Sequence, residues 1–238
     1  MSSAVVPAPP PSASEVFGPA LALAEQYARL LAGPGVERGL IGPREAGRLW
    51  ERHLLNCAVV DELVPHGASL IDIGSGAGLP GIVLALLRPD LRVTLLEPMA
   101  RRVTFLGECV AGLRLGNVTV HRGRAEEVTG HLAADVVTAR AVAPLDRLAT
   151  LALGLVRPGG TVLALKGERA AHEAKAAGPA LRRLGVTEVT VLSAGTGRIH
   201  PATTVVRLIA PGTGGYTGSL PVAGPESRRR RSSTRARK

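Results

Sequence analysis

Aromatic side chains are scarce in this sequence, because Phe, Trp and Tyr together make up 2% of its 238 residues. Proteins that hold single-stranded nucleic acid by stacking bases on aromatic rings need more of them. Cysteine is scarce as well, and Cys57 and Cys109 stand apart without a C-x-x-C partner. This spacing argues against a disulfide framework or a zinc site and predicts two buried thiols.

Long apolar runs are also missing. No window reaches the ~18 uninterrupted apolar residues of a membrane-spanning helix. The N-terminal stretch MSSAVVPAPPPSAS has neither the basic segment nor the apolar run of a signal peptide. We therefore expect a cytoplasmic monomer with no membrane partner and no metal. A chain of 238 residues with 45% hydrophobic composition predicts one main domain with a sizeable core.

The formal net charge of +10 is unevenly distributed along the chain. Residues 211–238 hold seven cationic side chains against Glu226, which gives +6 and leaves +4 for the rest. This segment lacks apolar periodicity, as does the Pro-rich start, so we expect residues 1–14 and 211–238 to be disordered. The basic tail fits a non-specific tether to nucleic acid and a merely solvated tail about equally well.

Between these ends, short apolar runs alternate with longer amphipathic stretches. Helices are expected over 14–32, ended by Gly33-Pro34, and over 43–63, opened by Pro43. They form a helical N-terminal unit over 15–64. The alternation over 65–210 predicts an α/β domain with a mostly parallel sheet covered by helices on both faces. Its last two strands, 187–195 and 203–210, should pair antiparallel because their loop is too short for a crossover helix.

A glycine-rich stretch, IDIGSGAGLPG at 71–81, follows the first strand of this domain and precedes its first helix. It satisfies G-x-G-x-x-G, and Glu97 ends the next strand, where an acid would hold ribose hydroxyls. A dinucleotide and S-adenosylmethionine are both compatible with this pattern, and a tight turn without a ligand is the plain alternative. Asp72 extends the pattern to D-x-G-x-G-x-G, and Pro80 enters the first helical turn. This resembles motif I of the class I S-adenosylmethionine-dependent methyltransferases.

Further motifs make the resemblance specific. The segments RHLLNC, DIGSGAGLPG, LLEPMARRVTFL, RAEEV, TARAVAPL and ALKG occur in the order found in the small-subunit rRNA guanine-N7 methyltransferases, the RsmG or glucose-inhibited division protein B family. The match covers roughly residues 45–210. It implies a Rossmann-like class I fold with a seven-stranded, mostly parallel sheet and an antiparallel last strand. It also implies S-adenosylmethionine as cofactor and 16S rRNA or the small ribosomal subunit as partner.

The resemblance also implies roles for individual residues. The cofactor would be bordered by a set of turn and loop residues: Gly74, Gly76, Gly78 and Leu79 at the methionine and adenosine portions, Glu97 at the ribose, and Ala125 and Glu126 at the adenine. Arg140 would lie where cofactor and substrate meet.

Methyl transfer to guanine N7 needs alignment and no general base, because N7 carries a lone pair and no proton. The site must hold an unstacked guanine with donors such as Arg or Lys. Candidate donors are His53, Arg124, Arg140 and Lys166. Each has a plain alternative: His53 caps or packs on its helix, Arg124 pairs with Glu126 or Glu127, and the other two are solvated strand-end charges. Arg140 and Lys166 are favoured, because both end predicted strands on the ligand side.

Other function classes fit less well. An enzyme acting on exocyclic amines would carry an Asn/Asp-Pro-Pro-aromatic segment where this chain has ARAVAP, and neither cysteine is placed to attack a base. Three alternatives stay open: a methyltransferase of this fold acting on a small molecule or a protein, a non-catalytic RNA-binding module, and, more distantly, a dinucleotide oxidoreductase.

Overall fold

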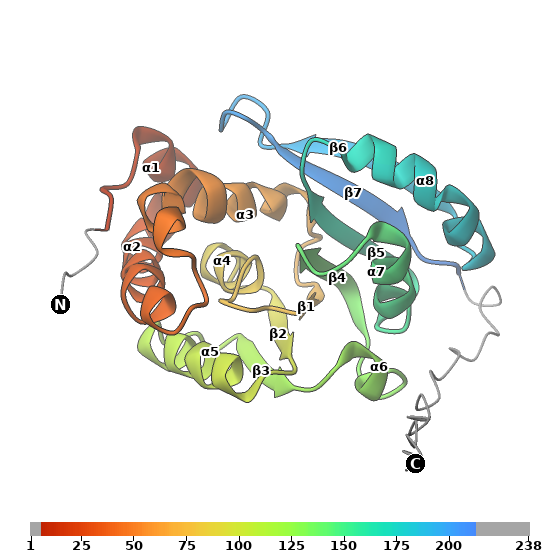
Figure 1. The fold of residues 1–238 in the computed structure, drawn as a ribbon, viewed down its shortest axis with the longest axis horizontal. Helices are drawn as coiled ribbons and strands as arrows, with labels where there is room; N and C mark the ends of the chain where they lie inside the picture. The colour runs from red at the N-terminus through yellow and green to blue at the C-terminus, as the bar shows by residue number, and fades with distance from the viewer. Residues whose placement is uncertain (1–5, 213–238) are drawn as a thin grey trace, which may run out of the picture.

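A seven-stranded sheet forms the centre of the molecule in a computed structural model that describes residues 6–212 (Figure 1). Its strand order is β3-β2-β1-β4-β5-β7-β6. The four pairs among β1 to β5 are parallel, whereas β7 runs antiparallel to both β5 and β6. The strands are β1 (Ser69–Ile73), β2 (Arg92–Glu97), β3 (Val118–Arg122), β4 (Ala134–Arg140), β5 (Val156–Lys166), β6 (Glu188–Ala194) and β7 (Thr203–Ile209). The predicted sheet, including the antiparallel last pair, is confirmed.

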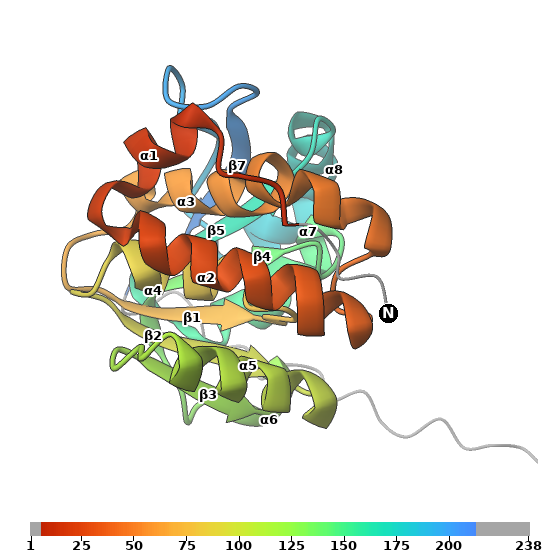
Figure 2. The same cartoon turned by 90° about the vertical axis from the view of Figure 1, so that its left-hand side faces the viewer.

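Helices cover both faces of the sheet, as Figures 1 and 2 show. One face packs against α4 (Gly81–Leu87), α5 (Ala100–Gly112) and the N-terminal helices. The other packs against α6 (Ala125–Val128), α7 (Leu145–Leu153) and α8 (Ala170–Arg183). Successive residues of a strand point to opposite faces, so Leu95 joins the first core and Leu96 the second. Both cysteines are buried free thiols, as predicted.

The N-terminal helical region differs from the expectation in where its helices begin and break. Helix α1 (Pro11–Phe17) begins before residue 14, and Ala13 is fully buried, so the expected disorder over 1–14 is wrong from residue 11 onward. The cause is a proline at the start of an apolar pattern, which suits the first helical turn. Gly18, at φ +47°, then separates α1 from a 3₁₀ turn at Gly18–Ala20 and from α2 (Leu21–Leu30).

The helical path also continues past the expected stop at Gly33-Pro34, through a wide π-helical turn at Leu31–Gly35. Residue 7 is already tied to the fold, because Trp50 Nε1 donates a hydrogen bond of 2.9 Å to the carbonyl oxygen of Pro7. Residues 1–5 and 213–238, and with them the expected disorder of the basic tail, lie outside the described residues.

The segment 43–63 is helical throughout, as predicted, but it is built from short pieces. They are a 3₁₀ helix (Pro43–Arg48), a π-helix (Trp50–Leu55), α3 (Asn56–Ala58) and a 3₁₀ helix (Val59–Leu63). Trp50 anchors the segment, since it is 1% exposed and packs edge-on against Phe17, with 6.0 Å between the ring centroids. This anchor places the π-helix beside the carboxyl end of β4. Within residues 6–212, every helix is too short or too polar to cross a membrane.

Candidate active site

The glycine-rich turn connects β1 to α4 in a backbone path that side chains would block. Gly74, Gly76 and Gly78 have φ values of +64°, +58° and +99°. A Cβ on Gly78 would lie 2.7 Å from the hydroxyl oxygen of Tyr27. That hydroxyl donates a hydrogen bond of 2.6 Å to the carbonyl oxygen of Ala77, so α2 supports the turn from below. Glycine is required here both for conformation and for space.

Asp72 fixes the two ends of this turn. Its carboxylate accepts hydrogen bonds from the backbone N–H of Gly81, at 3.1 Å, and from the Thr138 hydroxyl, at 3.2 Å. The side chain is completely buried, and burial raises the pKa of Asp72 to about 7. The motif residue Asp72 therefore joins β1, β4 and the start of α4, and it does not face a ligand cavity.

Glu97, at the end of β2, faces the same turn. One carboxylate oxygen accepts a hydrogen bond of 2.9 Å from Gly76 N, and the other accepts one of 3.0 Å from Met99 N. Arg102 Nη1 lies 3.6 Å from Glu97 Oε2. The side chain is 1% exposed. A buried carboxylate is thus held next to the glycine backbone by N–H donors and one cation.

A cavity of about 290 Å³ opens beside the turn, between the ends of β1, β2 and β4. It gathers four residues that the sequence singled out: Gly74, Arg124, Ala125 and Glu126. The loop after β4 closes the opposite side with Val142 and Pro144. Gly76, Gly78 and Leu79 are not among its lining residues, and Leu79 is buried in the core.

Arg124 stands at the start of α6, where its backbone N–H donates a hydrogen bond of 2.9 Å to Glu127. Its side chain lines the same cavity as Glu126. The structure therefore places Arg124 with the expected adenine-side residues, apart from Arg140 and Lys166.

Arg140 ends β4 and contacts the N-terminal helices. Its Nη1 atom lies 2.9 Å from His53 Nδ1, and His53 Nε2 lies 3.1 Å from Glu45 Oε2. Burial, followed by the charge of Arg140, lowers the pKa of His53. The next residue, Ala141, has φ +54°, a strained conformation for a residue with a Cβ. Backbone strain of this kind is common at functional sites.

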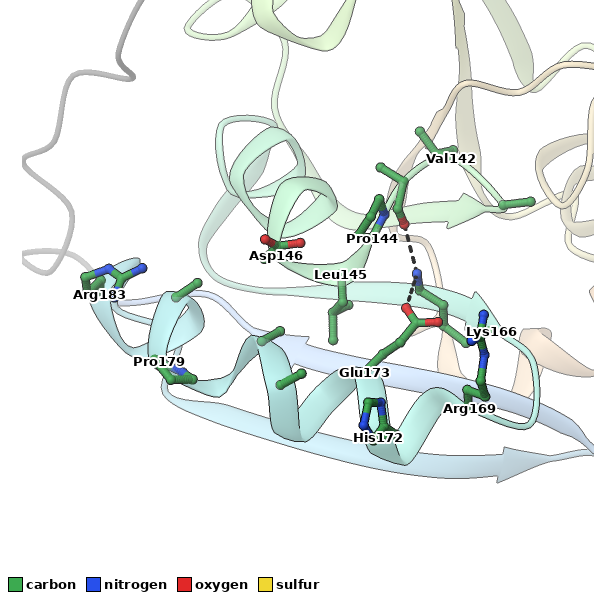
Figure 3. A pocket seen from close by; sticks show the side chains of 15 residues that line it. Val142, Pro144, Leu145, Asp146, Lys166, Arg169, His172, Glu173, Pro179 and Arg183 are labelled. Carbon is green, nitrogen blue, oxygen red and sulfur yellow. Dashed lines mark hydrogen bonds and ion pairs between the residues drawn. The ribbon is translucent and has the colours of Figure 1, made fainter.

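Lys166 ends β5 and is held by two oxygens, as Figure 3 shows. Its Nζ atom lies 2.9 Å from the carbonyl oxygen of Ala143 and 2.9 Å from Glu173 Oε2. A cavity of about 340 Å³ is lined by Arg140 and Lys166, together with Arg52, Asn56, Glu173 and Thr203. Of the four candidate donors, Arg140 and Lys166 share this cavity, and His53 contacts Arg140.

Sequence reasoning missed three side chains of the site: Tyr27 beneath the turn, Glu45 behind His53, and Glu173 at Lys166. Tyr27 is 50 positions from Ala77 in the sequence, whereas Glu45 and Glu173 are near His53 and Lys166 in the sequence but stand on different helices or strands, so helical periodicity did not signal them. Within residues 6–212, no group of three or more His, Cys, Asp or Glu side chains is arranged to hold a metal ion.

Two solved structures share this architecture. The S-adenosylmethionine-dependent methyltransferase SibL, in its apo form, matches with a TM-score of 0.56 at 20% identity, over 82% of this chain and 70% of SibL. An S-adenosylmethionine-dependent O-methyltransferase from Thermotoga maritima matches with a TM-score of 0.53 at 14% identity, over 66% of this chain and 65% of its own. The fold is therefore the Rossmann-like fold of S-adenosylmethionine-dependent methyltransferases, as the sequence predicted.

Comparison with protein families narrows this class. The GidB family model, described as rRNA small subunit methyltransferase G, matches residues 20–201. Proteins named ribosomal RNA small subunit methyltransferase G are 61% identical over 208 residues in Thermobifida fusca, covering 87% of each chain, and 50% identical over 235 residues in Mycolicibacterium gilvum, covering 97% and 99%. The chain belongs to the rRNA small subunit methyltransferase G family. The resemblance stated from the motifs is confirmed.

Proposed function

We propose that this protein transfers a methyl group from S-adenosylmethionine to N7 of a guanine in 16S rRNA of the small ribosomal subunit. The observation that supports the proposal is that two groups of candidate residues both lie at the carboxyl ends of the strands. The glycine turn with Glu97 forms one, and Arg140 with Lys166 forms the other. In a sheet of this topology, ligands bind at that edge.

The turn and its surroundings suit S-adenosylmethionine. The cofactor supplies a methyl group on a cationic sulfonium. A glycine backbone at Gly74 and Gly76 allows close approach, and the carboxylate of Glu97 offers acceptors for the ribose diol. Ala125 and Glu126 line the cavity on the side proposed for the adenine, where Arg124 also lies.

The second group suits a guanine and needs no base. Guanine N7 has an in-plane lone pair, so the protein must orient it and remove no proton. Arg140 and Lys166 bring N–H donors to one cavity, and such donors read the O6 edge of guanine or its phosphates. The Lys166 ammonium is already paired with Glu173, which supports a role in positioning over one in proton transfer.

A groove of about 790 Å³ between α7 and α8 leads away from Lys166 (Figure 3). Arg169 precedes α8 and Arg183 ends it, and both are exposed and line the groove. Fourteen helical residues separate them by roughly 20 Å, the length of a few nucleotides. We place the rRNA backbone flanking the target guanine along this groove, with the two guanidinium groups on its phosphates.

The domain division is part of the proposal: residues 65–210 bind cofactor and substrate, and the helices before residue 65 brace the turn and Arg140 from outside. We further propose that the protein acts as a monomer in the cytoplasm.

The decisive experiment maps modified nucleosides. Purified protein is incubated with 16S rRNA or small subunits and S-adenosylmethionine carrying a labelled methyl group, and the rRNA is digested for mass analysis. We expect label in 7-methylguanosine from one loop. Label on an exocyclic amine, on a ribose or on a protein would contradict the assignment.

A further inference from the structure

Three side chains from separate elements form a continuous chain behind the substrate cavity. Arg140 comes from the end of β4, His53 from the π-helix Trp50–Leu55, and Glu45 from the 3₁₀ helix Pro43–Arg48. The contact between Arg140 Nη1 and His53 Nδ1 measures 2.9 Å, and that between His53 Nε2 and Glu45 Oε2 measures 3.1 Å. The His53 side chain is 13% exposed, so solvent replaces these contacts poorly.

The partners fix the protonation of the imidazole ring. A guanidinium only donates hydrogen bonds, so the Nδ1 atom of His53 must offer its lone pair to Arg140. A carboxylate only accepts, so Nε2 must carry the proton that is donated to Glu45. Both contacts are hydrogen bonds only when His53 is neutral and protonated on Nε2.

We propose that Glu45 and His53 are positioning residues that hold the Arg140 guanidinium toward the substrate cavity and do so only while His53 is neutral. The proposal rests on the role given to Arg140 above. An arginine side chain has many rotamers, and one fixed N–H contact at its tip removes most of them. The strained backbone of Ala141 fixes the chain on the other side of Arg140. Arg140 Nη1 also lies 3.5 Å from the carbonyl oxygen of Arg52, and Arg140 lines the cavity proposed for the guanine.

The charges around His53 give this arrangement a pH dependence. Burial lowers the pKa of His53 most, Arg140 from β4 and the neighbouring Arg52 lower it further, Glu45 opposes them, and Arg48 acts on Glu45. As the pH falls through the depressed pKa of His53, Nδ1 gains a proton and turns an N–H toward a cation. The Arg140 contact is then lost. Methylation at saturating rRNA should therefore decline on the acid side, although N7 methylation itself uses no base.

Two substitutions of His53 separate the two contacts, because the Asn amide reaches the place of Nδ1 and the Gln amide reaches the place of Nε2. His53→Asn keeps an acceptor for Arg140 that does not titrate. We expect it to retain kcat within about threefold and to lose the acid decline. His53→Gln and His53→Ala should lower kcat by about tenfold to a hundredfold, the usual range for one lost hydrogen bond to a charged group. Equal kcat in the Asn and Gln variants would overturn the proposal.

Glu45→Gln tests the direction in which the pKa of His53 shifts. It removes the charge that raises the pKa of His53, so the acid decline should move to lower pH. Glu51→Gln, an equal charge change at an exposed position of the π-helix, is the matched control and should leave the profile in place. An acid decline that stays put in Glu45→Gln, or moves equally in Glu51→Gln, would exclude the arrangement.

An experiment without substrate keeps this inference separable from the rRNA assignment. Nitrogen NMR of ¹⁵N-histidine-labelled full-length protein reports the tautomer and the pKa of His53 directly. We expect the Nε2–H tautomer, a pKa that rises in Arg140→Ala and a pKa that falls in Glu45→Gln. A proton on Nδ1 at neutral pH would refute the arrangement even if 16S rRNA is methylated. If the NMR results agree and 16S rRNA is not methylated, only the proposed substrate fails.

Discussion

The two halves of the proposed site are built in different ways. Around the proposed cofactor side, backbone groups provide most of the contacts: Gly76 N and Met99 N donate to Glu97, and Gly81 N donates to Asp72. On the proposed substrate side, side chains hold other side chains, as in Arg140–His53–Glu45 and Lys166–Glu173. The backbone contacts join residues 2 to 21 positions apart, whereas Arg140 and His53 are 87 positions apart and meet only because the N-terminal helices pack beside β4. The proposed cofactor half therefore depends on backbone geometry, and the proposed substrate half depends on side-chain packing and protonation.

The largest effect should come from removing the substrate side alone. In Arg140→Ala combined with Lys166→Met, we expect methylation of rRNA to fall at least about a hundredfold, since a small misplacement of reactants costs that much. Cofactor affinity, measured by calorimetry, should stay within about twofold of the parent protein. A large loss of cofactor affinity would show that the two halves are one coupled unit, and full activity would remove both residues from the mechanism.

The reverse experiment removes one contact of the cofactor side. Glu97→Ala should weaken S-adenosylmethionine binding by about 1–3 kcal/mol, the cost of losing a charge-assisted hydrogen bond. Glu97→Gln is the matched control, because it keeps the size and one acceptor while removing the charge. Its affinity should lie between those of the alanine variant and the parent protein. Unchanged calorimetric affinity in the alanine variant would take Glu97 out of the cofactor site.

The different construction of the two halves also explains which features could be read from the sequence. The sheet, its antiparallel last pair and the turn followed from alternation and from glycines that tolerate positive φ. The positions of Glu97, Arg140 and Lys166 at strand ends followed from the same alternation. Glu45, Tyr27 and Glu173 could not be predicted, because their partners lie on other elements and only the tertiary packing brings them together.

The N-terminal boundary was wrong for a related reason. A Pro-rich composition indicates disorder in a segment that makes no tertiary contacts. Here Ala13, Val16 and Phe17 are buried, and Trp50 Nε1 donates a hydrogen bond to the carbonyl oxygen of Pro7. Composition describes the isolated segment, whereas the helix at residues 11–17 is stabilised by the whole fold.

Asp72, which holds the glycine turn of the proposed cofactor half, can be tested through stability. Its pKa of about 7 in the fold exceeds the ordinary 3.8, so between these values the folded state holds a proton that the unfolded chain has released. This group therefore makes the protein less stable as pH rises from about 4 to 7. In Asp72→Asn that loss should be absent. Denaturant unfolding of both proteins across this range measures it, and parallel stability curves would contradict the raised pKa.

The smallest effect concerns the groove between α7 and α8, where contacts to phosphates are electrostatic and individually weak. Arg183→Gln should lower rRNA affinity severalfold and reduce the slope of log affinity against log salt by about 0.7–0.9, the value for one phosphate contact. Lys175→Gln is the control, because Lys175 is exposed on α8 but is not among the residues lining the groove. Filter binding at several salt concentrations distinguishes the variants. If both lower the slope equally, the rRNA responds to the net charge of α8, and the groove is not its path from Lys166.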